Sequence, residues 1–352
     1  MGVKVSVIMP SLNVGRYIEK CIESVMGQSL KEIEIIAVDA GSEDGTLEIL
    51  ERAAAKDGRI RIINSPVKSY GYQMNLGLKA AQGEYIGIVE TDDWAEPEMF
   101  KKLYETAASS GAEVVKSSFR MFWEESGKSM VYKMPVDYAK LKTFCPVMDL
   151  EDLQVSEFFA LKTSIWSAIY SRSFLERNQI LFNETPGAAF QDTAFNFKVF
   201  SLAKKVRVIR DVFLNYRQDN ENSSVNSKEK AWCITDEYRE IEAFILKNDS
   251  IGEGLKQRLL AVMVRTKFDN YLWNAGRLAD EILPDFVRYA SREFADAVDK
   301  KYALAAYFPP FKWEHFKLWA SDPESFRRLI ENEKKISPVK RAVRKLGRML
   351  KK

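Results

Sequence analysis

Short apolar runs alternate with helical patterns over the first 117 residues, and this alternation limits the fold more than any other feature of the chain. The apolar runs predict strands at 3–9, 33–38, 59–63, 84–89 and 113–117, with Pro10 ending the first. Helical spacing of apolar residues separates them, at 16–27, 44–56, 70–81 and 97–110. Such alternation predicts an α/β fold, a mostly parallel sheet with helices on both faces, whose ligands bind at the carboxyl ends of the strands.

The pattern changes after this region. Residues 120–160 are irregular and rich in aromatic side chains, and a helix and then a strand at 206–209 follow them. From about residue 228 the signal is almost wholly helical. We therefore expect two parts, an α/β domain over 1–225 and a helical C-terminal region over 226–352.

The composition restricts the chemistry that the chain can perform. Its only histidine is His315, which excludes Ser-His-Asp triads, the usual Cys-His dyads and histidine-rich metal sites. Three widely separated cysteines, Cys21, Cys145 and Cys233, give neither a disulfide framework nor a zinc-binding pair. Acid–base chemistry must therefore come from carboxylates, lysine, tyrosine or cysteine. No apolar run has the length of a membrane-spanning helix and the N-terminus lacks a secretion pattern, so we expect a cytoplasmic protein.

Basic residues are concentrated at the C-terminal end. The segment 334–352 has nine Lys and Arg and no Asp or Glu, whereas residues 1–333 have 44 basic and 50 acidic residues. Within 338–352, apolar residues recur at helical spacing, at Val339, Val343, Leu346 and Leu350, which predicts a basic amphipathic helix. Such a helix can lie on an anionic membrane, here the inner face of the plasma membrane. It can also bind a partner protein, pack on the rest of the chain or remain solvated. Binding of nucleic acid is disfavoured, because residues 1–333 are acidic overall.

Three carboxylates follow the expected strand at 84–89 within four residues: Glu90, Asp92 and Asp93. Like charges this close repel each other, so packing alone does not explain them. Magnesium typically binds one or two carboxylates together with substrate phosphates. One interpretation is therefore a metal–diphosphate site, and the other is an acidic loop that begins the next helix.

A loop with two glycines, 39–46, follows the second expected strand. Gly41 and Gly45 permit tight turns and close approach of a ligand, and Asp39 can accept hydrogen bonds from a base or a ribose. The loop can equally be a turn that caps the next helix. The chain has neither the dinucleotide-binding glycine fingerprint nor a P-loop.

Five successive blocks of the sequence have an order and spacing typical of one enzyme family. They are Val5–Asn13, Tyr17–Gln28, Val38–Thr46, Asn75–Gly83 and Tyr85–Trp94. These blocks resemble the family 2 glycosyltransferases, which have the GT-A fold. Weaker similarity continues to Tyr216 and does not reach the helical region. The resemblance implies that 1–225 is a catalytic domain, with a nucleotide-sugar part at 1–117 and an acceptor part at 118–225.

The resemblance implies a role for each matching residue. Asp192, in the block that is similar to the family's Glu-Asp pair, would be the general base. Asp93 would bind the metal, with Asp92 beside it near the ribose. The nucleotide sugar would be bound by Pro10, Ser11, Leu12, Asn13, Asp39, Gly41, Ser42, Gln73, Asn75, Glu90, Thr91 and Asp92. The acceptor would contact Trp94, Trp166, Gln191 and Arg217.

The chain departs from the family pattern in three places. Ala40 stands where a second aspartate frequently reads uracil, Gln73 and Met74 replace an Ala-Arg pair, and Gln191 replaces a glutamate. None of these changes removes the metal ligand or the base. Each assigned residue also has a structural alternative, since Asp192 can stabilise a helix N-terminus and the tryptophans can be packing residues.

The resemblance implies an inverting glycosyltransferase. It would move a sugar from a nucleotide-diphosphate sugar, with a UDP-sugar favoured, to a hydroxyl of a cell-surface glycan or a lipid-linked acceptor. Mn²⁺ or Mg²⁺ would neutralise the diphosphate leaving group while a carboxylate deprotonates the acceptor. The alternative is a non-catalytic scaffold of the same fold that binds nucleotide or glycan. A nucleotidyltransferase is disfavoured because no Gly-rich basic loop follows the first strand; an oligomer is compatible with either interpretation.

Overall fold

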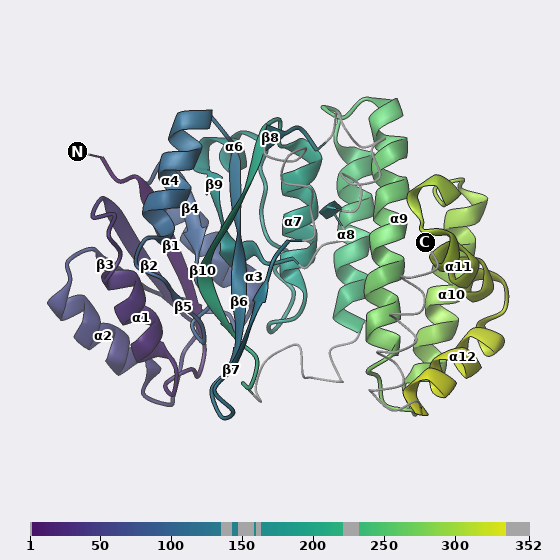
Figure 1. Cartoon of the computed structure of the whole chain (residues 1–352), viewed down its shortest axis with the longest axis horizontal. Helices are drawn as coiled ribbons and strands as arrows, with labels where there is room; N and C mark the ends of the chain where they lie inside the picture. The colour runs from purple at the N-terminus through teal and green to yellow at the C-terminus, as the bar shows by residue number, and fades with distance from the viewer. Residues whose placement is uncertain (1, 135–142, 147–157, 160–162, 221–231, 336–352) are drawn as a thin grey trace. The chain divides into compact units, whose positions relative to one another are not determined.

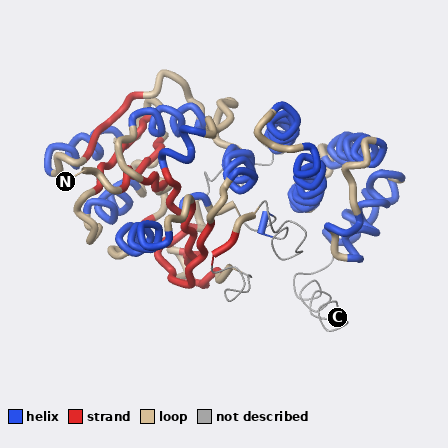
Figure 2. The backbone as a smooth tube through the Cα atoms, turned by 90° about the horizontal axis from the view of Figure 1, so that it is seen from above, coloured by secondary structure: helices blue, strands red, loops and turns tan. Residues whose placement is uncertain are grey.

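The computed structural model describes residues 2–134, 143–146, 158–159, 163–220 and 232–335 (Figure 1). The chain divides into two compact units, Met1–Asn226 and Ser227–Lys352. The strands belong to the first unit, and the described part of the second is helical (Figure 2).

The N-terminal unit is built on a mixed sheet covered by helices. Its strands are β1 (Val5–Ser11), β2 (Ile33–Asp39), β3 (Ile60–Asn64), β4 (Tyr85–Ile88), β5 (Trp94–Ala95), β6 (Val114–Trp123), β7 (Lys128–Tyr132), β8 (Thr143–Phe144), β9 (Ala168–Ser171) and β10 (Val206–Arg217). Its helices are α1 (Ile18–Met26), α2 (Thr46–Lys56), α3 (Tyr70–Ala80), α4 (Met99–Ser110), α6 (Arg172–Arg177) and α7 (Gln191–Leu202), with a 3₁₀ turn, η1, at Ile165–Ser167.

The strand order β3-β2-β1-β4-β9-β6-β10-β5 brings the long strands into one direction. β1 pairs in parallel with β2 and β4, and β2 with β3. β9 is antiparallel to both β4 and β6, so β6 runs the same way as β4, and β10 is parallel to β6. The carboxyl ends of β1, β2, β4 and β10 therefore lie at one edge of the sheet. This is the mostly parallel α/β arrangement that the sequence predicts.

Close packing against glycines shows that helices cover both faces of this sheet. Gly77 of α3 faces Ile8, and Gly87 of β4 faces Phe100 of α4. Val7 pairs with Gly87, and its neighbour Ile8 points to the opposite face because side chains alternate along a strand. α3 and α4 therefore lie on opposite faces.

Two strand ends predicted from the sequence are wrong in detail. β1 does not end at Pro10 but continues to Ser11. Pro10 pairs with Val38 of β2, and β4 ends at Ile88, so no strand on that other side needs an N–H at Pro10. β10 does not end at Ile209 but reaches Arg217 across a register shift, where Arg210 and Asp211 are exposed and break the apolar alternation.

The region from residue 120 also contains regular structure that the sequence pattern does not show. β6 extends to Trp123 and forms a hairpin with β7. The four residues of β7 from Lys128 to Val131 are exposed, so no buried apolar face marks this strand.

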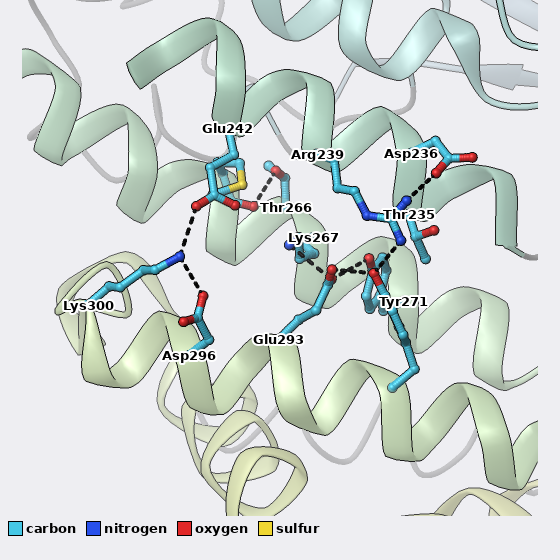
Figure 3. A network of polar contacts seen from close by, with 12 residues as sticks. Thr235, Asp236, Arg239, Glu242, Thr266, Lys267, Tyr271, Glu293, Asp296 and Lys300 are labelled. Carbon is cyan, nitrogen blue, oxygen red and sulfur yellow. Dashed lines mark hydrogen bonds and ion pairs between the residues drawn. The ribbon is translucent and has the colours of Figure 1, made fainter. Parts of the chain in front are cut away.

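The described C-terminal unit contains α8 (Cys233–Lys247), α9 (Glu253–Ala275), α10 (Leu283–Asp299), a 3₁₀ turn at Ala305–Tyr307, α11 (Pro310–Ser321) and α12 (Pro323–Lys335). Polar contacts join three of these helices around Glu293 of α10 (Figure 3). Lys267 and Tyr271 of α9 bind its carboxylate at 3.0 and 2.7 Å, and Tyr289 connects it to Arg239 of α8.

Within the described residues, we find no helix long and apolar enough to cross a membrane. The basic helix predicted at 338–352 lies outside the described residues.

Candidate active site

Asp39 ends β2 beside Ser11 of β1, and its buried carboxylate organises the loop that follows. Oδ1 accepts hydrogen bonds from the hydroxyls of Ser11 and Ser42 at 3.0 and 2.6 Å. Oδ2 accepts from the N–H groups of Gly41 and Ser42 at 2.9 and 2.8 Å, and Gly41 has a φ of 79°, which favours glycine. These bonds use all the acceptor positions of a carboxylate. A base or ribose would therefore have to displace a serine hydroxyl to bind Asp39.

Two polar side chains of α3 hold the protein's own backbone. Gln73 is buried, and its Nε2 donates to the carbonyls of Ser11 and Val38 at 2.8 and 2.7 Å. Asn75 donates to the carbonyl of Phe182 at 3.0 Å and accepts from the N–H of the same residue at 2.9 Å. Gln73 thus fixes the ends of β1 and β2, and Asn75 fixes the segment that leads towards α7.

The loop after β1 is tied to both neighbouring loops. The Thr91 hydroxyl donates to the Pro10 carbonyl at 2.7 Å. Asn13 is exposed, has a φ of 53° and accepts from the N–H of Glu43 at 2.9 Å, while Leu12 is half-buried. The residues that the sequence predicts at these three strand ends therefore lie together.

Glu90 is bound by a side chain of α3. Its Oε1 accepts a 2.6 Å hydrogen bond from the hydroxyl of Tyr70, at the start of α3. Burial raises the pKa of Glu90 to about 8, and the charges of Asp92 and Asp192 act in the same direction. Glu90 therefore belongs to a half-buried pair with Tyr70.

Asp92 and Asp93 are held by the end of β10. The N–H of Arg217 donates to Asp93 Oδ1 at 2.8 Å, its Nε donates to the Asp92 carbonyl at 3.0 Å, and Asn220 donates to Asp92 Oδ2 at 2.8 Å. Burial raises the pKa of both carboxyls, and Asp92 adds to this effect at Asp93. Among the described residues, Oδ2 of Asp93 is buried and has no hydrogen-bond partner.

Aromatic rings cover the basic groups beside these carboxylates. The buried guanidinium of Arg217 lies 4.5 Å from the ring centre of Tyr17 and pairs with Glu124. Trp94 is half-buried, and the ammonium of Lys20 lies 3.3 Å from its ring centre. Arg217 therefore supports the acidic segment, whereas Trp94 and Lys20 are partly accessible to a ligand.

Asp192 lies in the first turn of α7, where a constrained loop sets its direction. Gln191 accepts from the N–H of Ala189 at 2.7 Å and donates to the Thr185 hydroxyl and the Gly187 carbonyl at 2.9 and 3.1 Å. The hydroxyl of Thr163 donates to Asp192 Oδ2 at 2.7 Å. Asp192 is half-buried, so it can meet a substrate, while buried Gln191 holds the loop.

Tyr216 connects the two groups of carboxylates electrostatically. Burial raises the pKa of its phenol most, and the charges of Asp93, Asp92, Asp192 and Glu90 raise it further. Charge–charge interactions weaken with distance, so groups that shift the pKa of one side chain lie in the same part of the unit. The acidic segment and Asp192 are far apart in the sequence, but both lie near Tyr216.

Trp166 is a packing residue in this structure. It is 6% exposed, and its ring lies 4.6 Å from Phe119 and 4.7 Å from Tyr216, measured between ring centres. It supports Tyr216 rather than offering an open surface to an acceptor.

The sequence motifs do not include several residues that hold the site, among them Tyr70, Thr163, Asn220 and Lys116, whose ammonium donates to the carbonyl of Ser164. The sequence does mark Lys116, because a lysine is unusual in a buried strand such as 114–119. It does not mark Tyr70 and Thr163, since their partners lie 20 and 29 residues away.

The acidic segment has some of the features of a metal site. The described residues contain no group of three or more His, Cys, Asp or Glu side chains that could hold a metal ion. The unpartnered Asp93 oxygen and half-buried Asp92 nevertheless fit a cation that takes one or two carboxylates and completes its shell with substrate phosphates.

The sheet and its strand-end site define an α/β protein of the GT-A type. The structure is similar to S. aureus TarS 1-349 in complex with UDP-GlcNAc, with a TM-score of 0.74, 21% identity and coverage of 94% of this chain and 90% of that chain. It is also similar to mannosyltransferase PcManGT of Pyrobaculum calidifontis in complex with GDP-Man and Mn²⁺, with a TM-score of 0.52, 16% identity and coverage of 95% and 87%. At these identities the likeness shows the fold.

The model of glycosyl transferase family 2 matches residues 6–201, more than half of the chain, which therefore belongs to this family. EpsJ of Bacillus subtilis, an uncharacterized glycosyltransferase, is 35% identical over 62% of each protein, so the chain matches less than two thirds of its length. Glycosyltransferase GlyG of Streptococcus pneumoniae is 30% identical over 77% of this chain and 87% of its own length. The family and fold predicted from the sequence are thus confirmed.

Proposed function

We propose that the protein transfers a sugar from a nucleotide-diphosphate sugar, a UDP-sugar, to a hydroxyl group with inversion at the anomeric carbon. The observation that carries the proposal is that Asp93 has a buried, unpartnered carboxylate oxygen after β4, among the described residues, while half-buried Asp192 of α7 and Asp93 both raise the pKa of Tyr216. One site thus has acidic groups for a cation–diphosphate pair and a separate carboxylate for a proton. The membership of the family supports the same chemistry.

Asp192 is the proposed general base. Its half-buried carboxylate takes the proton of the acceptor hydroxyl while that oxygen forms a bond to the anomeric carbon. The bond from the anomeric carbon to the diphosphate oxygen breaks, and the nucleoside diphosphate leaves with the electron pair. The hydrogen bond from the Thr163 hydroxyl to Oδ2 orients this carboxylate.

Asp93 and Asp92 are the proposed ligands of Mn²⁺ or Mg²⁺. A bound divalent cation would neutralise charge on the diphosphate as it leaves. The chain's part is to keep two carboxylates at the end of β4, and Arg217 does this through the N–H of its backbone and its Nε.

The donor and acceptor are inferred from chemistry and from relatives. TarS, a similar fold, is known in complex with UDP-GlcNAc, which supports a UDP-sugar. We infer that the acceptor is a cell-surface glycan or a lipid-linked glycan, and that the basic segment 338–352 places the enzyme at the inner face of the plasma membrane.

Thermal shift with UDP, GDP, CDP and dTDP, each with and without Mn²⁺, tests the donor site. We expect UDP to stabilise the wild type only with Mn²⁺ and to have no effect on Asp93→Ala. Asp211→Ala, which changes an exposed aspartate of β10, is the matched control. Stabilisation of Asp93→Ala equal to that of the wild type would refute the metal assignment.

Turnover separates an enzyme from a scaffold that only binds nucleotide. Release of UDP from UDP-GlcNAc and from UDP-glucose, with Mn²⁺, is compared between the wild type and Asp192→Asn. We expect slow release by the wild type, because water can replace the acceptor, and a loss on the order of 100-fold in Asp192→Asn. Equal release by both proteins would remove Asp192 from the mechanism.

A further inference from the structure

Lys116 is a buried lysine near the start of strand β6. It is 3% exposed, and its Nζ donates a hydrogen bond to the carbonyl of Ser164, which is also buried. Burial lowers the pKa of Lys116 to about 7, and the negative charge of Asp192 opposes this shift. A buried ammonium is costly unless it is paired or hydrogen-bonded, so an apolar residue would serve packing better at this position.

The hydrogen bond of Lys116 reaches the candidate base through one peptide unit. Ser164, whose carbonyl accepts from Lys116, directly follows Thr163, whose hydroxyl donates to Asp192 Oδ2 at 2.7 Å. The next residue of β6, Ser117, donates to the carbonyl of Ser167 at 3.1 Å, and the Ser167 hydroxyl donates to the Ser164 carbonyl at 2.9 Å. Two neighbouring residues of β6 therefore hold the turn that carries Thr163.

We propose that Lys116 is a positioning residue for Asp192, holding the Ser164 backbone where the Thr163 hydroxyl orients the Asp192 carboxylate. The inference rests on the proposed role of Asp192 as the base. The described titratable groups whose pKa Asp192 influences come from separate elements: Tyr70, Glu90, Lys116, Tyr170 and Tyr216. Lys116 is the cation among them, so replacing it should change the interaction energy of Asp192 with its surroundings.

A double-mutant cycle on unfolding tests this link without any substrate. The midpoints of urea unfolding are measured for Lys116→Met, Asp192→Asn and the double variant at about pH 6, where the ammonium is charged. We expect the double variant to shift the midpoint by less than the two single shifts together, because each single change removes the same coupling. Lys198→Met is the matched control, since Lys198 is a buried lysine of α7 that donates to the carbonyl of Leu181. Its cycle with Asp192→Asn should be additive, and additivity in the Lys116 cycle would overturn the proposal.

Thr163 tests the same link from the other side, and it serves even where Lys116→Met does not fold. Release of UDP from UDP-GlcNAc and from UDP-glucose, with Mn²⁺, is measured for Thr163→Val and Thr163→Ser. We expect Thr163→Val to lower kcat about tenfold with an unchanged donor KM, and Thr163→Ser, which keeps the hydroxyl, to remain near the wild type. An unchanged kcat in Thr163→Val overturns the proposal.

The two hypotheses fail in different ways. Wild-type UDP release by Asp192→Asn would refute the base, and with it the reason for positioning. Loss of release in Asp192→Asn, together with an additive Lys116 cycle, would refute the positioning role alone.

Discussion

The backbone N–H of Arg217, the last residue of β10, donates a 2.8 Å hydrogen bond to Oδ1 of Asp93, 124 residues earlier in the chain. The guanidinium of Arg217 also donates to the Asp92 carbonyl, pairs with Glu124 and lies over the ring of Tyr17. One arginine thus connects β10, the acidic segment and the start of α1. The carboxylates that follow β4 are therefore held by a residue near the C-terminal end of the N-terminal unit.

Replacing this arginine should weaken the metal site without removing its ligands. Arg217→Gln keeps the N–H that binds Asp93 but loses the contacts of the guanidinium. We expect a loss of about 2 kcal/mol in the free energy of unfolding, because a buried charge-assisted network is broken, and a higher Mn²⁺ concentration for stabilisation by UDP. Urea unfolding and a Mn²⁺ titration followed by thermal shift measure these effects. Arg210→Gln, at an exposed position of β10, is the control, and equal Mn²⁺ dependence in both variants would contradict the prediction.

The strands and helices whose residues show a regular apolar pattern could be predicted from the sequence. β1 to β4 and the helices between them have clear periodicities, and their loops hold most of the candidate site residues. The extension of β10 was missed because the exposed pair Arg210 and Asp211 interrupts its apolar pattern. β7 was missed because its exposed residues carry no alternation.

The site was predicted less completely, because contacts between distant segments decide what a polar side chain does. Gln73 lies where the resemblance places a nucleotide contact, yet its amide binds two backbone carbonyls. Asn75 binds Phe182, 107 residues later. A motif gives the position of such residues along a strand or helix, but it does not give their partners.

Gln73 should therefore contribute to stability. Gln73→Ala leaves the buried carbonyls of Ser11 and Val38 without this donor, which should cost about 2 kcal/mol in the free energy of unfolding. Because these carbonyls lie beside Asp39, we also expect weaker stabilisation by UDP. Gln82→Ala, which changes an exposed glutamine after α3, should leave both quantities within experimental error. Similar unfolding midpoints for the two variants would show that Gln73 has no structural role.

Gly71 permits close contact between α3 and the segment that leads to α7. A Cβ at this position would overlap the carbonyl oxygen of Asn183, whereas a Cβ at Gly58 would meet no atom. We expect Gly71→Ala to destabilise the protein by about 2 kcal/mol, since overpacking forces the backbone to move, and Gly58→Ala to have little effect. Urea unfolding measures both. Equal midpoints of urea unfolding would mean that the backbone at 183–184 moves aside without loss of stability.

The pH dependence of stability should report the burial of Lys116. Its pKa is about 7 in the folded protein because burial disfavours the ammonium, and 10.5 is the ordinary value that applies in the unfolded chain. Below pH 7 both states hold the proton and the full cost of burying the charge is present. Between these two pKa values the unfolded state binds more protons, so the folded protein gains stability as the pH rises. Relative to Lys116→Met, the free energy of unfolding of the wild type should rise by at most about 1.4 kcal/mol per pH unit above pH 7. Urea unfolding at several pH values between 6 and 9 measures this difference, with Lys102→Met, at an exposed position of α4, as the control. A constant difference between wild type and Lys116→Met would mean that the buried amine does not titrate in this range.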